Sequence, residues 1–430
     1  MISDRTDAET YVWIWLPGAE EPVVAGRLTR SGSQLLFNYG RSYLARPDAI
    51  ALYAPELPLQ AGELPLLPGL SMPACIRDAS PDAWGRRVLI NRRLGQSGDA
   101  AAGNIANVEL DELAYLLESG SDRIGALDFQ RSATQYVARG GATASLDELS
   151  AASDMVQQGV PLTAELAQAL QHGTSIGGAR PKAPIEDGKK KFIAKFSAGT
   201  DTTNVVKAEF VAMRLAKKVG LNAAGVQLTR ALGRDVLLIE RFDRVRSRAH
   251  WQRRAMVSAL TLLELDEMMA AYASYENLAH IVRHRFTDPK ETLHELFGRI
   301  VFNILCGNTD DHARNHAAFW DGAQLTLTPA YDICPQSRTG QEASQAMLIH
   351  GSDRRSQIAT CIAGAAVFTL SAAAAIDIVN RQVATIKREW EATCKEAGMN
   401  EVERRSLWGR QFLNPYGFFE VPKGVRLPGA

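Results

Sequence analysis

The stretch "NTDDHARN", from Asn308 to Asn315, places two carboxylates, two amides and an imidazole within one short run of sequence. The apolar run "LFGRIVFNILCG" (296–307) precedes it, and "HAAFWDGAQLTLTPAYD" (316–332) follows it. The first is typical of a buried helix that ends at a glycine, and the second of a hairpin that turns at Asp321-Gly322. Runs this polar are usually solvated loops, but a polar loop between two buried elements also indicates a functional site.

The spacing of the polar residues favours one kind of chemistry. Asp310 is followed five positions later by Asn315, and Asp332 comes after the hairpin, in "TPAYD". Phosphoryl transfer requires such a set, because one carboxylate accepts the proton of the attacking hydroxyl while an amide oxygen and a second carboxylate hold Mg²⁺. The interval to Asn315 selects Asp310 as the base and leaves Asp311 as a helper or a bystander.

A zinc site is the competing interpretation of the same stretch. His312 and His316 are four positions apart, a spacing that can chelate zinc on one face of a helix. The run "HARNH" lacks the glutamate of HExxH, and no third soft ligand is close in sequence, so magnesium is favoured. A structural role for His312, bracing the loop by hydrogen bonds, is a further expectation.

Adjacent glycines upstream could approach an anion. Gly177 and Gly178 lie in "TSIGGARPKA" (174–183), and their backbone N–H groups can come close to a phosphate. The sequence matches neither the P-loop nor GxGxxG, so a tight hairpin turn is the alternative interpretation.

A lysine and a glutamate follow in chain order. Lys195 lies in the apolar strand "KKFIAKFSA", where a lysine must reach solvent, a carboxylate or a phosphate. Glu209 is the one carboxylate on the apolar face of the helix expected over 205–219, and a buried carboxylate needs a cationic partner. A strand lysine held by a helix glutamate is the arrangement that kinases use for nucleotide phosphates. A snorkelling edge-strand lysine is the alternative.

The run "LLIERFD" (237–243) is expected to be a buried strand followed by a connector, whose backbone could read a nucleotide base. A basic cluster containing Trp251 follows, and it indicates either a contact with nucleic acid or an acidic partner, or a solvated hairpin loop. The cluster comprises Arg241, Arg244, Arg246, Arg248, Arg253 and Arg254.

The order of the elements predicts several domains in the 430 residues. Strand-like runs fill 10–55, helices are expected over 80–94 and 110–120, and "DRIGALDFQ" is expected to be a strand. The polar, Ala/Ser/Gly-rich region 133–165 is expected to separate this part from a small α+β lobe, and a mostly helical lobe follows from Met256.

Composition limits the classes of protein. Lysine and arginine number 48, as do aspartate and glutamate, so any contact with nucleic acid must come from a local patch. The five cysteines show no CxxC spacing, and the N-terminus lacks the apolar run of a signal peptide, so we expect reduced thiols in the cytoplasm. The segment 359–379 has the length of a membrane span, but Thr, Ser and Asp377 interrupt it, and a buried helix is expected instead.

Together these motifs resemble the HipA toxin kinases, serine/threonine kinases of bacterial toxin–antitoxin modules. The resemblance covers roughly 10–335 by motif and implies an α+β, two-lobed protein-kinase-like fold with a β-rich N-terminal subdomain and a mostly helical C-terminal lobe. It implies domains at 1–135, 136–255 and 256–430. The motifs are "FNYGRSYL", "DASPDAWGRRVL", "RIGALDF", "SIGGARPK", "FIAKF", "AEFVAMRLAKKVGL", "IERFDR", "NTDDHARNH" and "LTPAYD".

The resemblance also implies residue roles. Asp310, Lys195 and Glu209 would be catalytic, and Asn315 and Asp332 would hold Mg²⁺. ATP would be contacted by Ser175, Gly177, Gly178, Lys195, Glu240, Phe242, Asp243 and His312. Ser175 would be the autophosphorylation site, with Thr174 as a second acceptor. The loop sequence "GGARPK" departs from the Gly-x-Gln-x-Lys of better-known members, and this departure bears on autoregulation.

The partners that the resemblance implies are a HipB-like, DNA-binding antitoxin and a protein substrate such as an aminoacyl-tRNA synthetase. Two alternatives remain. One is a catalytically weak HipA-like protein that acts mainly as a corepressor, bound to its antitoxin and to DNA through the Arg241–Arg254 cluster. The other is a small-molecule kinase, which the N-terminal part does not favour.

Overall fold

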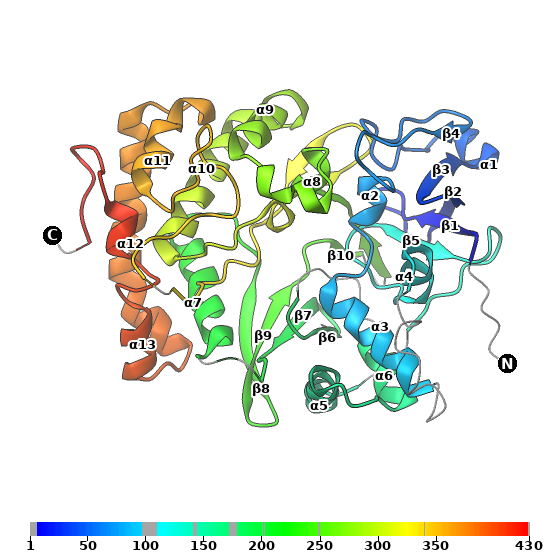
Figure 1. The fold of residues 1–430 in the computed structure, drawn as a ribbon, viewed down its shortest axis with the longest axis horizontal. Coiled ribbons are helices and arrows are strands. Elements are labelled where there is room, and N and C mark those ends of the chain that lie inside the picture. The colour runs from blue at the N-terminus through cyan, green and yellow to red at the C-terminus, as the bar shows by residue number, and fades with distance from the viewer. Residues whose placement is uncertain are drawn as a thin grey trace. The chain divides into compact units, whose positions relative to one another are not determined.

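The computed structural model describes residues 7–96, 110–140, 144–171, 179–199, 201, 203–247, 250–338 and 340–428. The chain forms two compact units, each with its own core (Figure 1). Both helices and sheets are present, which confirms the predicted α+β class, while the division into three domains stays a prediction. Unit 1 contains Met1–Thr200, Thr229–Val257 and Trp320–Ala323; unit 2 contains Asp201–Leu228, Ser258–Phe319 and Gln324–Ala430.

Unit 1 begins with a five-stranded antiparallel sheet of order β4-β3-β2-β1-β5. It confirms the strands predicted in the N-terminal part. Its strands are β1 (Glu9–Ile14), β2 (Val23–Ser31), β3 (Gln34–Tyr39), β4 (Glu63–Leu64) and β5 (Leu127–Gln130). The helices are α1 (Arg41–Leu44), α2 (Ala74–Arg77), α3 (Ala83–Gln96) and α4 (Glu112–Glu118). Helix α4 is capped at Ser119 in an extended conformation, one residue before the predicted end at Gly120.

The region 133–165, for which the sequence predicted no helix or strand, contains helix α5 (Leu146–Gln158). Ser145 and Glu148 form a capping box, and Gly159 ends the helix with a left-handed φ of 71°. The residues Leu149, Ala152 and Val156 recur at helical spacing and join a buried apolar cluster. The small and polar residues between them hid this pattern. Helix α6 (Ala164–Gln171) follows.

A four-stranded sheet of order β6-β7-β9-β8 comes next and carries the predicted lysine on an interior strand. Its strands are β6 (Lys182–Glu186), β7 (Lys191–Phe196), β8 (Val226–Ala231) and β9 (Arg234–Glu240). The short strands β10 (Arg244–Ser247) and β11 (His250–Arg253) then pair with each other, and β12 (Ala255–Ser258) follows.

Unit 2 is mostly helical, as predicted. Helix α10 packs against α9, α11 and α12, and α7 packs along α12. The hairpin predicted over 317–328 is present as β13 (Ala317–Trp320) and β14 (Leu325–Leu327). The helices are α7 (Val205–Lys218), α8 (Ala259–Leu262), α9 (Tyr275–Arg285), α10 (Pro289–Cys306), α11 (Ile358–Ala363), α12 (Ala372–Glu396) and α13 (Glu401–Leu407). The 3-10 turns are η3 (Glu267–Tyr272), η4 (Ala313–Asn315), η5 (Ala365–Phe368) and η6 (Pro415–Phe418).

The prediction of a single helix over 359–379 is wrong, because three separate helical elements share this range. Gly364 caps α11, Thr369 ends η5 with a left-handed φ of 61°, and Ser371 caps the new helix α12. The chain therefore turns twice inside this alanine-rich run. Within the ranges given above, we find no helix with the length and apolarity needed to cross a bilayer.

Candidate active site

The loop after α10 is fixed by the end of that helix. Gly307 adopts φ 74°, and a Cβ at this position would lie 2.8 Å from the backbone oxygen of Gln411, so glycine is required for both reasons. The backbone N–H of Asn308 donates to the carbonyl of Asn303 (2.8 Å), and that of Gln336 donates to the carbonyl of Gly307 (3.0 Å). The loop therefore leaves the helix along a defined path.

The adjacent aspartates have opposite surroundings. Asp311 is 3% exposed, and its carboxylate accepts hydrogen bonds from Asn303 Nδ2 (2.6 Å), His316 Nε2 (3.1 Å) and the Tyr275 hydroxyl. Asp310, one residue earlier, has an exposed side chain. The hydrogen bonds of Asp311 therefore stabilise the loop, whereas the side chain of Asp310 remains accessible.

The pKa values of Asp310 and Asp311 are shifted in opposite directions. Partial burial, followed by the negative charges of Asp332 and Asp311, raises the pKa of the Asp310 carboxyl, while His312 opposes this. Burial also acts to raise the pKa of Asp311, but the charge of His316 and the hydrogen bonds from His316 and Tyr275 outweigh it, so that pKa is lowered. A raised pKa makes a carboxylate a better proton acceptor, which is what a general base needs.

The side chains of Asn315 and Asp332 offer oxygen atoms that could bind a metal ion. Asn315 Nδ2 donates to the backbone carbonyl of Asp310 (3.1 Å), whereas Asn315 Oδ1 has no hydrogen bond within the described part of the chain. Asp332 adopts φ 58°, a left-handed conformation that is strained for most residues and is often found at functional sites. The negative charge of Asp332 is one of the causes that raise the pKa of Asp310. A carboxylate and an amide oxygen, as in Asp332 and Asn315, are ligands of the kind that Mg²⁺ prefers.

The zinc interpretation gains no support from this arrangement. His316 is buried and its Nε2 is already bound to Asp311. Within the described ranges, no group of three or more His, Cys, Asp or Glu side chains is placed to hold a metal. His312 Nδ1 is buried without a hydrogen-bond partner among the described residues, so a polar group of a ligand could satisfy it.

The lowered pKa of Asp311 leads to a prediction about acid stability. A carboxylate whose folded pKa lies below its unfolded value stabilises the fold above the unfolded pKa, and this contribution is lost as pH falls through the folded pKa. Asp311→Asn is expected to lower the free energy of unfolding by about 2 kcal/mol at neutral pH. The difference from the wild type should shrink below about pH 4.

Urea unfolding followed over that pH range by circular dichroism checks this prediction. Glu401→Gln, which removes an exposed carboxylate from the same unit, serves as the control and should stay within about 0.5 kcal/mol of the wild type. A difference between wild type and Asp311→Asn that is constant with pH would contradict the assignment.

The predicted lysine and glutamate lie on the predicted elements. Lys195 is 9% exposed on β7, opposite Lys182 on β6 and Leu237 on β9. Glu209 is 2% exposed on α7. Their pairing stays a prediction.

The sequence did not predict the buried ion pair between Lys182 Nζ and Asp82 Oδ2 (3.0 Å). The signal that could have indicated it is a lysine beside apolar residues in a strand, which needs an acidic partner when it is buried. Thr174, Ser175, Gly177 and Gly178 lie outside the described residues.

The connector, which we define as residues 240–243, follows β9. Glu240 pairs with Phe192 in the sheet, and its side chain binds Lys190 (2.6 Å). The Asp243 carboxylate is buried and accepts hydrogen bonds from Arg241, Arg244 and the backbone N–H of Gly125. These contacts give Asp243 a structural role, and its predicted contact with ATP stays a prediction.

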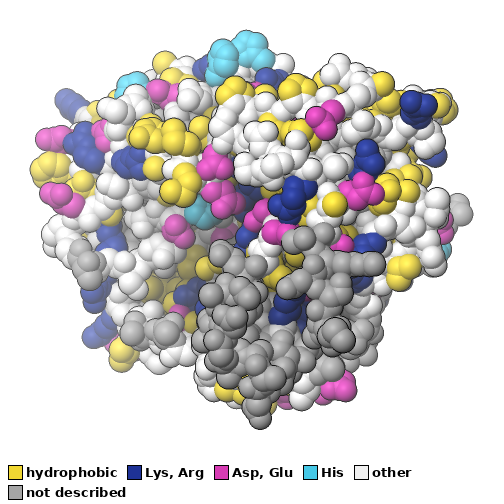
Figure 2. Space-filling view, turned by 45° about the vertical axis from the view of Figure 1, so that its right-hand side comes forward, with side chains coloured by type: hydrophobic (Ala, Val, Ile, Leu, Met, Phe, Trp, Pro, Cys, Tyr) yellow, Lys and Arg dark blue, Asp and Glu magenta, His cyan; other side chains and the backbone are white. Residues whose placement is uncertain are grey.

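The predicted basic cluster is wrong for its first two members. Arg241 and Arg244 are 4% and 6% exposed and form ion pairs with Asp122 and Asp243, so they are closed to nucleic acid. Arg253 stacks over the Trp15 ring at 3.5 Å. Arg246 and Arg254 are exposed, and Arg248 lies outside the described residues. Figure 2 shows basic and acidic side chains interspersed over the described part of the visible face, without a broad basic patch.

Comparisons with known proteins give matches to one family. Two family models match the chain: the HipA N-terminal domain over residues 14–130 and the HipA-like C-terminal domain over 174–390. Among curated proteins, the putative kinase Y4mE of Sinorhizobium fredii is 26% identical over 178 residues, which cover 37% of this chain and 41% of that protein. The serine/threonine-protein kinase toxin HipA of Shewanella oneidensis is 26% identical over 186 residues, covering 37% of this chain and 42% of that protein.

This chain therefore spans about two fifths of the length of the curated relatives it matches. Among solved structures, HipA from the Shewanella oneidensis HipA, HipB and operator DNA complex is similar with a TM-score of 0.65 and 19% identity. The match covers 94% of this chain and 98% of that chain, and at this identity it shows a shared fold.

Proposed function

Because this chain belongs to the HipA family, whose C-terminal domain model alone covers residues 174–390, we propose that it is an ATP- and Mg²⁺-dependent protein serine/threonine kinase of the HipA toxin type. The observation that carries the proposal is the contrast between the two adjacent aspartates. Asp311 is buried and bound on three sides, whereas Asp310 is exposed, and its pKa is raised next to Asp332. This contrast supports a general base on a rigid loop.

The roles proposed for the other residues follow from their chemistry. Asp310 would accept the proton of the substrate hydroxyl, and Lys195, with Glu209 as its partner, would bind the nucleotide phosphates. Asn315 Oδ1 and the Asp332 carboxylate would hold Mg²⁺, which neutralises phosphate charge when bound. Backbone groups of Glu240 and Phe242 would contact the base. Ser175 would be the autophosphorylation site.

The proposed partners follow from the family. The solved neighbour was captured with HipB and operator DNA, which supports a HipB-like antitoxin and an indirect association of this chain with DNA. Direct contact through Arg241 and Arg244 is not part of the proposal, because both are buried. The substrate would be an aminoacyl-tRNA synthetase or another translation component. The cysteines Cys75, Cys306, Cys334, Cys361 and Cys394 are free and buried, which supports a cytoplasmic location.

The test is transfer of labelled phosphate. The purified protein is incubated with γ-labelled ATP, Mg²⁺ and a bacterial lysate, and we expect label in one or a few proteins identified by mass spectrometry. Asp332→Ala should reduce the label by at least about 100-fold, because one carboxylate of the proposed metal site is lost. Asp48→Asn, which removes an exposed carboxylate in unit 1, should leave it unchanged.

A folded wild-type protein that labels nothing would contradict the kinase proposal and favour the corepressor. Label found only in small molecules would instead favour a small-molecule kinase.

A further inference from the structure

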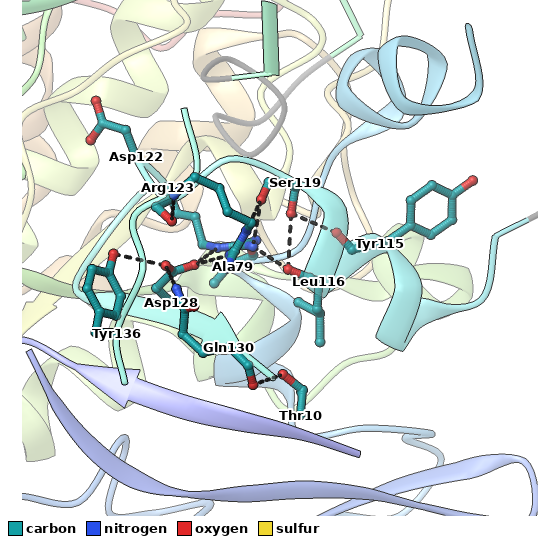
Figure 3. A network of polar contacts seen from close by, with 12 residues as sticks. Thr10, Ala79, Tyr115, Leu116, Ser119, Asp122, Arg123, Asp128, Gln130 and Tyr136 are labelled. Atoms are coloured by element: carbon teal, nitrogen blue, oxygen red, sulfur yellow. Dashed lines mark hydrogen bonds and ion pairs between the residues drawn. The ribbon is translucent and has the colours of Figure 1, made fainter. Parts of the chain in front are cut away.

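The short segment between α4 and β5 carries two neighbouring side chains that point in opposite directions (Figure 3). Arg123 is fully buried, and its guanidinium binds Asp128 Oδ1 (2.9 Å) and the carbonyls of Ala79 (3.0 Å) and Leu116. Asp122 points away from this group. Arg123 therefore anchors the segment to the N-terminal subdomain and leaves Asp122 to face another element.

The element that Asp122 faces is the connector. Asp122 Oδ1 lies 3.0 Å from Arg241 Nη1 and 2.8 Å from Arg244 Nη2, and Asp122 Oδ2 lies 3.5 Å from Lys191 Nζ at the start of β7. Arg241 is inside the connector and Arg244 directly follows it. One carboxylate of the N-terminal subdomain thus binds the start of β7, the connector and the start of β10.

The backbone of the same segment strengthens this junction. The carbonyl of Arg123 accepts hydrogen bonds from Arg241 Nη2 (2.7 Å) and Arg244 Nη2 (2.5 Å). In the other direction, the backbone N–H of Gly125 donates to Asp243 Oδ2 (2.9 Å). The connector is therefore held through both of its arginine neighbours and through its own aspartate.

The charges at the junction make Asp122 hard to replace. Arg241 and Arg244 share the two carboxylates of Asp122 and Asp243, and Lys191 lies between Asp122 and Glu186. Burial alone would raise the pKa of Asp243, but the charges of Arg241 and Arg244 bring it to about 2, so the carboxylate stays ionised. Removing Asp122 would leave the buried pair Arg241 and Arg244 with one carboxylate, Asp243, in place of two.

We propose that Asp122 is a positioning residue through which the N-terminal subdomain fixes the connector and thereby sets the affinity for the nucleotide. The proposal rests on the proposed function, because the connector is taken to contact the base. Asp122 itself touches neither ATP nor the protein substrate. Its effect is on the geometry of residues 240–243, where misplaced backbone groups would lose their hydrogen bonds to the base.

The test combines nucleotide affinity with hydrogen exchange. Asp122→Asn is expected to raise the Kd for Mg-ATP, measured by calorimetry, by about tenfold. Exchange at the amides of 240–243 should become faster in the nucleotide-free protein. Asp122→Glu keeps the charge and should recover part of both effects.

Glu118→Gln is the matched control. Glu118 lies in the same subdomain and also bridges two arginines, Arg92 (2.9 Å) and Arg93, neither of which belongs to the connector. This variant should leave both the affinity and the exchange at 240–243 unchanged, although it removes the same charge.

Each outcome separates the two proposals. If the folded wild type binds no ATP, the proposed function fails, and the exchange measurement still decides the role of Asp122. Wild-type exchange at 240–243 in Asp122→Asn would overturn the positioning role, as would an equal change in Glu118→Gln. Faster exchange with unchanged ATP affinity would overturn the link to the nucleotide.

Discussion

Asp310→Asn is expected to lower phosphoryl transfer by about 10²–10⁴-fold while the protein stays folded. The amide cannot accept the proton of the attacking hydroxyl, although its shape is nearly that of the carboxylate. The side chain of Asp310 is exposed, and the loop is held by other residues, so unfolding by urea should change little. Initial rates of label transfer, measured with saturating ATP, check the prediction.

The neighbouring aspartate provides the comparison. Asp311→Asn should weaken the fold more than Asp310→Asn does, because it replaces the charged acceptor of Tyr275, Asn303 and His316 by a neutral amide. Its remaining activity, measured at a temperature where it is folded, should exceed that of Asp310→Asn. Undiminished transfer by Asp310→Asn would refute the base assignment, and total inactivity of a folded Asp311→Asn would show that the wrong aspartate was chosen.

Arg123→Met is expected to have the largest effect on stability, a loss of about 3–5 kcal/mol in the free energy of unfolding. The guanidinium is fully buried, and it binds the Asp128 carboxylate and the carbonyls of Ala79 and Leu116. Methionine fills much of the volume but donates to neither carbonyl, and the Leu116 carbonyl is left with the long hydrogen bond from Ser119 Oγ (3.4 Å). Asp128 would keep one cationic partner, Arg139 (2.7 Å).

Urea unfolding by circular dichroism measures this loss. Arg46→Met is the control, because Arg46 forms an exposed ion pair with Asp48, and we expect a change within about 0.5 kcal/mol. Adding Asp128→Asn to Arg123→Met should recover part of the stability, since a buried carboxylate that has lost one of its two cations is then replaced by a neutral amide. A loss below about 1 kcal/mol in the single variant would contradict the account of this network.

Local patterns predicted much of the fold. The end of α10 at Gly307, the hairpin at Asp321-Gly322 and the strand that carries Lys195 all follow from periodicity and turn residues. The pattern failed in the alanine-rich stretches, where small side chains carry little periodic signal. Helix α5 was missed there, although the capping box of Ser145 and Glu148 marked its start.

The partners of charged residues were the harder part to predict. Arg241 and Arg244 were taken for a basic surface because their partner Asp122 lies more than a hundred positions earlier in the chain. Asp311 gave the same difficulty, since its partner Tyr275 comes from another helix. Spacing shows which side chains lie on one element, but only the tertiary structure shows which charges are neutralised.

The opposed side chains of Asp122 and Arg123 have a consequence for shortened forms of the protein. A chain that began after this dipeptide would keep Arg241 and Arg244 but only one of the two carboxylates that bind both of them. The connector and its neighbour would then carry one negative charge less for the same two guanidinium groups. A minimal catalytic fragment of this protein must therefore begin before Asp122, although every residue assigned to the chemistry lies far beyond it.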